Sequence, residues 1–343
     1  MDTQPIHILS TLRLEECLLE RVRGLSPRLR VRQQTCRNEE EVTAALTPET
    51  EILWSFHVPR DLAGAPSLRW VQLHQAGADG LLGYPALAPD SAVLVTTASG
   101  IHAPFIGEWV LGSILYLNGR FAEAKAMHQA RQWPGNRRER FARRSLRGLT
   151  VGIVGYGSIG REVARLAATF GMRILALKFN PLHRADRGYV PDGLGDPQGA
   201  LPERFFGPEQ RLAMLAECDF VVLALPLTEA TRAFVGAAEF AAMKPSAYFI
   251  NIARGQLVDE AAMIAAVQGR RIAGVALDVF TQEPLPPDSP IWNLDPDRVL
   301  LSPHVSGFSL TYDDDAMLLF AENVRRYLGG QPLLNEVDRR LHY

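Results

Sequence analysis

The sequence predicts an α/β fold built on parallel sheets and divided into two domains. Short apolar runs alternate with helical patterns along the chain, which is typical of a parallel sheet with helices on both faces. One glycine-rich turn lies directly between such a run and a helix. With 343 residues, the chain is too long for one compact core of ordinary size and suits two domains.

Each element is expected where the apolar residues have the matching period. Helices are expected at 105–117, from about Ser158 to Phe170, and at 313–328 before two glycines. Residues 180–210 are rich in Pro, Gly and Asp, and we interpret them as a long surface loop. Strands are expected at 6–9, 51–56, 70–73, 92–96, 151–154, 172–177, 220–225, 248–252, 273–277 and 298–301.

The glycine-rich turn at 155–160 has the spacing G-x-G-x-x-G and predicts a dinucleotide site. Gly155 permits the tight turn, Gly157 lets the backbone approach a pyrophosphate, and Gly160 lets the helix pack on the strand. The phosphates would lie at the positive end of the following helix. The alternative is an ordinary structural turn. The expected cofactor contacts here are Gly155, Tyr156, Gly157, Ser158, Ile159 and Gly160.

Lys178, at the end of the next strand, favours NADP over NAD. A dinucleotide site that prefers NAD usually has an acidic residue here, which accepts hydrogen bonds from the adenosine ribose. A lysine cannot accept those bonds but can pair with the 2′-phosphate of NADP. The alternative is that Lys178 is a solvated strand end and that the site takes either cofactor, NADP or NAD.

Composition argues against several other functions. The net charge of −2 gives no electrostatic footprint for nucleic acid. The arginine-rich segment 137–147 is interrupted by Glu139, and we interpret it as a solvated helix face rather than a polyanion site. No histidine pairs with another histidine, a cysteine or a carboxylate at metal-ligand spacing, and no G-x-S-x-G nucleophile motif occurs.

The sequence predicts a cytoplasmic protein without a membrane segment. The three cysteines, Cys17, Cys36 and Cys218, show no C-x-x-C spacing, and their odd number argues against a disulfide framework. The N-terminus has no signal-peptide pattern, and the longest apolar runs are far too short to span a membrane.

Three segments after the glycine turn resemble the D-isomer-specific 2-hydroxyacid dehydrogenase family. They are 251–260 (NIARGQLVDE), 277–285 (LDVFTQEPL) and 302–307 (SPHVSG), and they occur in the family's order. The resemblance covers essentially the whole chain, is strongest from 148 to 338 and is weaker over the first 65 residues. Shorter similarities lie at 75–79, 218–220, 226–228, 322–328 and 332–335.

The resemblance implies three catalytic residues, and their chemistry suits the reduction of a 2-oxo acid. Arg254 offers a charged planar fork for the substrate carboxylate. His304 can give a proton to the carbonyl oxygen and take it back in the reverse direction. Glu283 would hold the other ring nitrogen and stabilise the charged ring. The alternatives are an ion-paired strand end for Arg254, a helix-start acid for Glu283 and a hydrogen-bonded loop residue for His304.

Further contacts are expected from the same resemblance. Asp278 would meet the nicotinamide carboxamide, or else have a structural role. The main-chain amides of Ala76 and Gly77 would bind the substrate carboxylate, together with Arg254 and His304. Further cofactor contacts are expected at Leu225, Pro226 and Ala253, whereas His57, His74 and His102 are expected to serve packing or hydrogen bonding.

The family fold implies two Rossmann-like or flavodoxin-like doubly wound domains with the active-site cleft between them. The substrate domain would be discontinuous, comprising 1–100 and 308–343, and the dinucleotide-binding domain would span 101–307. In this family the segment from about 105 to 149, which here contains Trp133, often forms a homodimer interface. A homodimer is therefore expected.

The expected activity is an NAD(P)-dependent reductase of a small 2-oxo acid, giving a D-2-hydroxy acid. A glyoxylate or hydroxypyruvate reductase is the first interpretation, because the cofactor argument favours NADP. A phosphoglycerate dehydrogenase is the second, and a dinucleotide-binding co-repressor-like protein that recognises partner peptides is a third. The related formate dehydrogenases have glutamine where this chain has Glu283, which argues against that activity.

Overall fold

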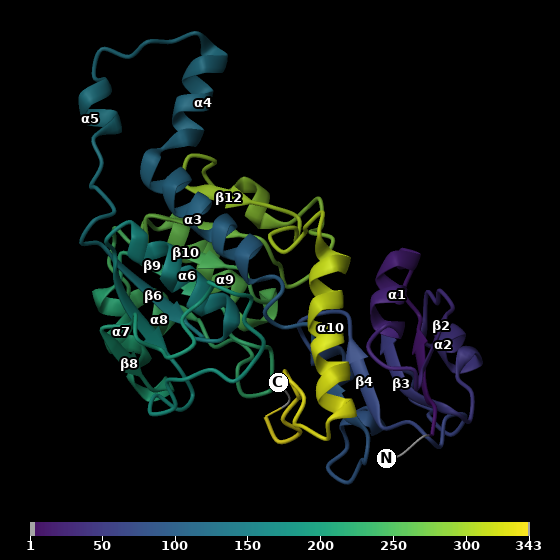
Figure 1. The fold of residues 1–343 in the computed structure, drawn as a ribbon. Helices are drawn as coiled ribbons and strands as arrows, with labels where there is room; N and C mark the ends of the chain where they lie inside the picture. Colours follow the sequence, from purple (N-terminus) through teal and green to yellow (C-terminus); the bar gives the residue numbers. More distant parts are fainter. Residues whose placement is uncertain (1–3, 342–343) are drawn as a thin grey trace. The chain divides into compact units, whose positions relative to one another are not determined.

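The computed structural model describes residues 4–341 and divides them into two compact α/β units (Figure 1). Unit 1 comprises the described residues up to Ile101, the short segment Arg187–Tyr189, and the chain from Ser309 onward. Unit 2 comprises His102–Asp186 and Val190–Phe308. The segment Arg187–Tyr189 thus packs with unit 1 although it lies inside the range expected for the dinucleotide-binding domain.

Unit 1 is a parallel five-stranded sheet in the order β2-β1-β3-β4-β5. One face is covered by the long C-terminal helix and α1, and the other by α2 and the segment that follows β4. The strands are β1 (Ile6–Ser10), β2 (Leu29–Gln33), β3 (Thr50–Ser55), β4 (Trp70–Leu73) and β5 (Leu94–Thr96). The helices are α1 (Glu16–Arg23), α2 (Glu39–Ala45), η1 (Asp79–Leu81), η2 (Pro85–Leu87) and α10 (Tyr312–Leu328).

Strand β2 was not expected from the sequence. Its residues alternate between apolar side chains at Leu29 and Val31 and arginines at Arg30 and Arg32, so it lacks the apolar run that marks the other strands. The strand pairs with β1 on one side only and is the edge of the sheet. Charged side chains are typical of an exposed edge.

Unit 2 is a parallel seven-stranded sheet in the order β12-β11-β10-β9-β6-β7-β8. The strands are β6 (Thr150–Val154), β7 (Arg173–Leu177), β8 (Arg204–Phe206), β9 (Phe220–Leu223), β10 (Tyr248–Asn251), β11 (Gly274–Leu277) and β12 (Val299–Leu301). The helices are α3 (Ala103–Gly119), α4 (Phe121–Ala130), α5 (Arg137–Phe141), α6 (Ser158–Thr169), η3 (Pro208–Gln210), α7 (Arg211–Glu217), α8 (Ala237–Ala242), η4 (Gly255–Leu257), α9 (Glu260–Gln268) and η5 (Pro290–Asn293).

Helices cover both faces of this second sheet, which explains why its strands are continuous apolar runs. Helices α3 and α6 pack on one face, and α7, α8 and α9 pack on the other. The chain passes from β6 to β7 in one direction and then returns to β9 on the other side of β6. This reversal between β6 and β9 is the position where open parallel sheets bind ligands.

Helices α4 and α5 project away from the sheet of unit 2 (Figure 1). Neither buries a side chain within the unit, and Arg120, in a left-handed conformation, separates α3 from α4. The arginines of α5 are exposed or only partly buried, as expected for a solvated helix face.

The interpretation of residues 180–210 as a surface loop is wrong in part. Residues Arg204–Phe206 form β8, which pairs with β7 at the edge of the sheet. Asp196 is buried and accepts hydrogen bonds from the Tyr156 hydroxyl at 2.7 Å and the Leu201 amide at 3.0 Å. The buried guanidinium of Arg161 also donates to main-chain carbonyls of this segment. These contacts are tertiary and polar, so no apolar period in the sequence marks them.

Candidate functional site

The carboxyl edge of the seven-stranded sheet gathers most of the residues expected at the site. In a parallel sheet all strands end at the same edge, so the loops that follow them are neighbours. The glycine turn follows β6, Lys178 follows β7, and the loop that begins with Leu225 and Pro226 lies just beyond β9. Ala253 and Arg254 follow β10, Asp278 and Glu283 follow β11, and His304 follows β12.

The glycine turn has the shape that a dinucleotide requires. Gly155 has φ +103°, and a Cβ there would lie 2.5 Å from the carbonyl oxygen of Ala224 beyond β9. A Cβ on Gly160 would clash with the carbonyl oxygen of Gly155 and lie 2.9 Å from Ile153. A Cβ on Gly157, in contrast, would meet no described atom within 4 Å. Packing thus requires Gly155 and Gly160, whereas Gly157 leaves open space where a pyrophosphate would approach.

Helix α6 starts directly after this turn and offers its amino end to that space. Its N-cap is Gly157, which has no side chain to cap the helix, and Ser158 and Ile159 form its first residues. The main-chain amides at such an end attract phosphate. The side chain of Tyr156 is buried and bonded to Asp196, so only its backbone is available to a cofactor. Burial, together with the Asp196 carboxylate, raises the pKa of Tyr156, so its phenol stays protonated.

Lys178 lies partly buried at the end of β7, where the sequence predicts the adenosine ribose. Among the described residues no carboxylate lies within ion-pair distance of its ammonium group. Burial lowers the pKa of Lys178, and the nearby Arg161 guanidinium lowers it further, while Asp186 opposes the shift. Because Arg161 is itself buried and pairs with Asp186 at 3.1 Å, Lys178 is the cation at this strand end that has no ion-pair partner among the described residues.

The turn that carries Arg254 is fixed from both sides. The side-chain nitrogen Nδ2 of Asn251 donates to the main-chain carbonyl of Arg254 at 3.1 Å. Its side-chain oxygen Oδ1 accepts from the main-chain amide of Ala253 at 3.1 Å. A Cβ on Gly255 would overlap the main chain of Phe280 and Thr281. Glycine at this position therefore lets the turn after β10 lie directly against the loop after β11. Asn251 and Gly255 belong to the 251–260 motif, but the sequence did not reveal their positioning roles.

Glu283 and His304 are brought together from the loops after β11 and β12. The Oε2 atom of Glu283 lies 2.7 Å from Nδ1 of His304, and its Oε1 atom accepts from the Phe280 amide at 3.0 Å. The two side chains are 37% and 47% exposed, so the pair is open to solvent. No described residue bonds the Nε2 atom of His304. This nitrogen can thus exchange a proton with a bound molecule.

Asp278 holds the loop that carries His304. Its carboxylate accepts hydrogen bonds from the Ser302 hydroxyl, from the Val305 amide at 2.9 Å and from the Ser306 amide at 2.9 Å. Its carbonyl accepts from the His304 amide at 2.8 Å, and His304 itself has φ +54°. Because Asp278 is fully buried, the structure supports its structural alternative. A contact with the nicotinamide carboxamide stays a prediction.

The expected substrate turn at Ala76 and Gly77 belongs to unit 1 and follows β4. The Gln75 carbonyl accepts from the Ala98 amide at 2.9 Å, and the Gln75 side chain donates to the Phe56 carbonyl at 3.2 Å. Among the described residues, nothing accepts from the amides of Ala76 and Gly77. Two unpaired amides in one turn can bind a carboxylate.

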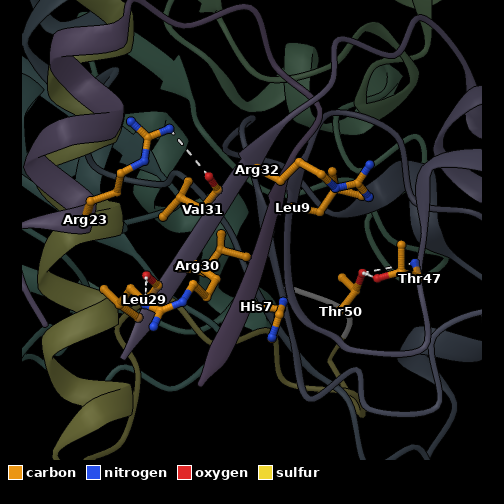
Figure 2. A pocket seen from close by; sticks show the side chains of 10 residues that line it. His7, Leu9, Arg23, Leu29, Arg30, Val31, Arg32, Thr47 and Thr50 are labelled. Carbon is orange, nitrogen blue, oxygen red and sulfur yellow. Dashed lines mark hydrogen bonds between the residues drawn. The ribbon is translucent and has the colours of Figure 1, made fainter. Parts of the chain in front are cut away.

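A cavity of about 310 Å³ lies elsewhere, on β1 and β2 of unit 1 (Figure 2). Its polar lining includes His7, Arg23, Arg30, Arg32 and Thr50. The arginines are already engaged, because Arg30 and Arg32 donate to main-chain carbonyls and Arg23 pairs with Glu20 at 2.7 Å. None of the expected site residues lines this cavity, so it is not the candidate site.

The described residues form neither a metal site nor a membrane-spanning helix. Among residues 4–341, no group of three or more His, Cys, Asp or Glu side chains could hold a metal ion. No helix in the described part of the chain has the length and apolar character needed to cross a membrane.

Known proteins of similar sequence point to the same chemistry. Residues 111–306 match the family described as D-isomer specific 2-hydroxyacid dehydrogenase, NAD binding domain. The (S)-sulfolactate dehydrogenase of Chromohalobacter salexigens is 34% identical over 78% of this chain and 80% of the relative. The glyoxylate reductase of Thermofilum pendens is 31% identical over 78% of this chain and 74% of the relative.

Solved structures of the same family share the fold along nearly the whole chain. A D-isomer specific 2-hydroxyacid dehydrogenase from Xanthobacter autotrophicus, in complex with NADPH and MES, has a TM-score of 0.77 at 28% identity, covering 99% of this chain and 100% of that one. An NADPH-dependent glyoxylate/hydroxypyruvate reductase from Sinorhizobium meliloti has a TM-score of 0.75 at 25% identity, covering 98% and 100%. The chain therefore belongs to the D-isomer specific 2-hydroxyacid dehydrogenases, which are NAD(P)-dependent oxidoreductases.

Proposed function

We propose that this protein reduces a small 2-oxo acid of the glyoxylate or hydroxypyruvate type to the D-2-hydroxy acid, with NADPH as the preferred donor. The observation that carries the proposal is the Glu283–His304 pair at 2.7 Å, on loops beside the fixed turn of Arg254. In this proposal residues 101–307 form the dinucleotide-binding domain, and 1–100 with 308–343 form the substrate domain.

Each catalytic residue has a distinct task. The bound nicotinamide would supply or accept the hydride. Arg254 would hold the substrate carboxylate with two parallel hydrogen bonds and polarise the adjacent carbonyl. His304 would donate a proton from Nε2 to the carbonyl oxygen during reduction and remove it during oxidation. Glu283, bonded to Nδ1, would keep the ring oriented and stabilise its positive charge.

The substrate carboxylate would also accept hydrogen bonds from the amides of Ala76 and Gly77. Their lack of other acceptors supports this role. The cofactor would contact the glycine turn at 155–160, and further along the edge Leu225, Pro226, Ala253 and Asp278.

The preference for NADPH rests on Lys178. Its ammonium has no ion-pair partner among the described residues, and two solved relatives at 28% and 25% identity hold NADPH or NADP. We expect Lys178→Asp to shift the ratio of kcat/KM for NADPH over NADH toward NADH by about tenfold or more. The matched control is Lys178→Arg, which keeps a positive charge at the same position and should leave the ratio close to that of the wild type. A wild-type enzyme that already prefers NADH tenfold would contradict this role.

A phosphoglycerate dehydrogenase is the second candidate. The enzyme of Methanocaldococcus jannaschii is 31% identical over 73% of this chain, but the match covers only 44% of that relative. Two relatives named glyoxylate reductase match over 78% and 81% of this chain, and the first candidate rests mainly on the cofactor argument from Lys178.

We also propose a cytoplasmic homodimer that does not bind nucleic acid or membranes. Helix α4 buries no side chain within its own unit, and Trp133 beyond it is 81% exposed. A projecting segment such as α4 and the residues up to Trp133 is stabilised when a second copy of the chain covers it. The three unpaired cysteines suit a reducing compartment.

One screen tests the proposed function. The purified protein would be assayed for oxidation of NADPH and NADH with glyoxylate, hydroxypyruvate, pyruvate, phenylpyruvate and 3-phosphohydroxypyruvate. We expect the highest kcat/KM with glyoxylate or hydroxypyruvate and NADPH. A clear preference for the phosphorylated acid would support the second candidate, and no turnover with any 2-oxo acid would refute the proposal.

A further inference from the structure

His74 is a buried, titratable side chain at the end of β4 that the proposed mechanism does not use. Its ring is 2% exposed and touches three aromatic rings, with centroid distances of 5.6 Å to Trp54, 4.7 Å to Phe56 and 5.0 Å to Tyr312. Its Nε2 atom lies 3.1 Å from Oδ1 of Asp313, in the first turn of α10. Its Nδ1 atom is buried and has no hydrogen-bond partner.

These contacts determine the tautomer of the His74 ring. A carboxylate only accepts hydrogen bonds, so Nε2 carries the hydrogen and Nδ1 is the bare acceptor. Burial lowers the pKa of His74, and the hydrogen bond to Asp313 opposes that shift only in part. Of the groups packed around the ring, Asp313 and Tyr312 titrate, whereas Trp54 and Phe56 carry no charge. The His74 ring is therefore neutral, and its single N–H group, at Nε2, donates to Asp313.

The backbone of His74 is tied to the same helix turn and leads directly into the substrate turn. Its carbonyl accepts from the Tyr312 hydroxyl at 2.6 Å, and its amide donates to the Ser55 carbonyl at 3.0 Å. Gln75, Ala76 and Gly77 follow without an intervening residue. The side chain and the carbonyl of His74 thus connect the turn to adjacent residues of α10.

We infer that the His74–Asp313 pair is a positioning device for the substrate turn, and this inference rests on the proposed function. The pair sets the direction in which the Ala76 and Gly77 amides point, and so it tunes the binding of the substrate carboxylate. His74 does not touch the substrate in this role. Because hydrogen bonds are strongly directional, a small rotation of the turn weakens the bond from each amide. The device therefore acts on substrate binding more than on the chemical step.

The first test removes the acceptor on α10. In Asp313→Ala, whose side chain is 49% exposed in the wild type, we expect the KM for the preferred 2-oxo acid to rise about tenfold, with kcat within about twofold. The Kd for oxamate, an unreactive 2-oxo acid analogue, should rise equally in the NADPH complex. Asp313→Asn keeps an acceptor oxygen and should stay close to wild type.

The matched control is Asp314→Ala. Asp314 neighbours Asp313 on the same turn, is similarly exposed at 56%, and makes only a surface ion pair with Arg21 at 3.5 Å. Its loss should leave both KM and the oxamate Kd unchanged. If Asp313→Ala lowers only the melting temperature, or if Asp314→Ala raises KM equally, the inference is overturned.

A double-mutant cycle shows whether Asp313 acts through His74. His74→Phe fills the ring volume but cannot donate, and we expect it to raise KM as much as Asp313→Ala does. The double variant should then be no worse than either single variant, because one shared bond is lost. Additive effects would overturn the inference. A wild-type protein without 2-oxo acid reductase activity would instead refute the proposed function, which separates the two failures.

Discussion

Each unit of this protein contains one histidine paired with a carboxylate, and the two pairs differ in almost every physical respect. In unit 2, His304 uses Nδ1 to meet Glu283 at 2.7 Å, and its Nε2 stays open on a ring that is 47% exposed. In unit 1, His74 uses Nε2 to meet Asp313 at 3.1 Å, and its Nδ1 is buried among aromatic rings. The same two functional groups thus give a solvent-accessible ring nitrogen in one unit and a buried hydrogen-bonded pair in the other.

The difference arises from where the backbone places each ring. His304 lies in a loop beyond the sheet, held in a left-handed conformation by Asp278, so its side chain stands clear of the core. His74 comes directly after the last residue of β4, where the side chains of β3 and α10 enclose it. Solvent access therefore decides which ring can exchange protons with a ligand.

The largest expected effect comes from removing the imidazole ring of the exposed pair, His304. His304→Gln should lower kcat/KM by about a hundredfold to ten-thousandfold in both directions, because no other group delivers the proton. Cofactor binding, followed by NADPH fluorescence, should persist, since the glycine turn is unchanged. His7→Gln, on β1 of unit 1, is the control. Turnover at the wild-type rate in His304→Gln would show that the acid–base group lies elsewhere.

The next effect concerns the cation beside the exposed pair. Arg254→Lys should bind cofactor normally but lose about tenfold to a hundredfold in kcat/KM, because a point charge cannot reproduce the two parallel hydrogen bonds of a guanidinium. Arg270→Lys keeps the same chemical change at the opposite, amino edge of β11 and should have no effect. Unchanged kinetics on every active 2-oxo acid would make Arg254 a structural residue.

Replacing the acid of the exposed pair should move a pH profile rather than abolish activity. In Glu283→Gln a neutral amide replaces the negative charge beside Nδ1 of His304, so the protonated ring is stabilised less. Reduction needs the protonated ring, so the alkaline fall-off in kcat/KM for reduction should move to lower pH. Oxidation needs the neutral ring and should change less at low pH. Glu283→Asp keeps the charge and should hold the profile closer to wild type; an unchanged profile in Glu283→Gln would contradict the role of Glu283.

The smallest effect is expected on stability, from the buried pair. Burial lowers the pKa of His74 below its ordinary value of about 6.5, so between the two values the unfolded chain binds more protons than the folded chain. The stabilisation is present above pH 6.5 and is lost as the pH falls toward the folded value. The free energy of unfolding of the wild type should therefore fall between pH 7 and pH 5. In His74→Phe this fall should be smaller by about 1 kcal/mol, measured by urea denaturation at both pH values. An identical loss in both proteins would place the acid sensitivity elsewhere.

Much of the site could be predicted because its motifs are local. The glycine spacing at 155–160, Arg254 in its ten-residue motif, and His304 after Pro303 are each set by a few adjacent residues whose conformations the sequence restricts. The strands of unit 2 are also visible locally, because helices on both faces make them continuous apolar runs. Edge strand β2 and the anchored part of 180–210 were missed, because their residues are polar and their partners are far away in the chain.

The sequence by itself determined the α/β class and the position of the dinucleotide turn, and it predicted Arg254, Glu283 and His304 as the catalytic residues, because these depend on short-range patterns and side-chain chemistry. Only the tertiary structure decided what each residue's neighbours are. It brought Glu283 to His304, placed Phe280 against Gly255, buried Asp278 beneath the loop that carries His304, and enclosed His74 beside Asp313, 239 positions away in the chain. Such contacts depend on strand order and on the packing of distant segments, which no local pattern in a single sequence encodes.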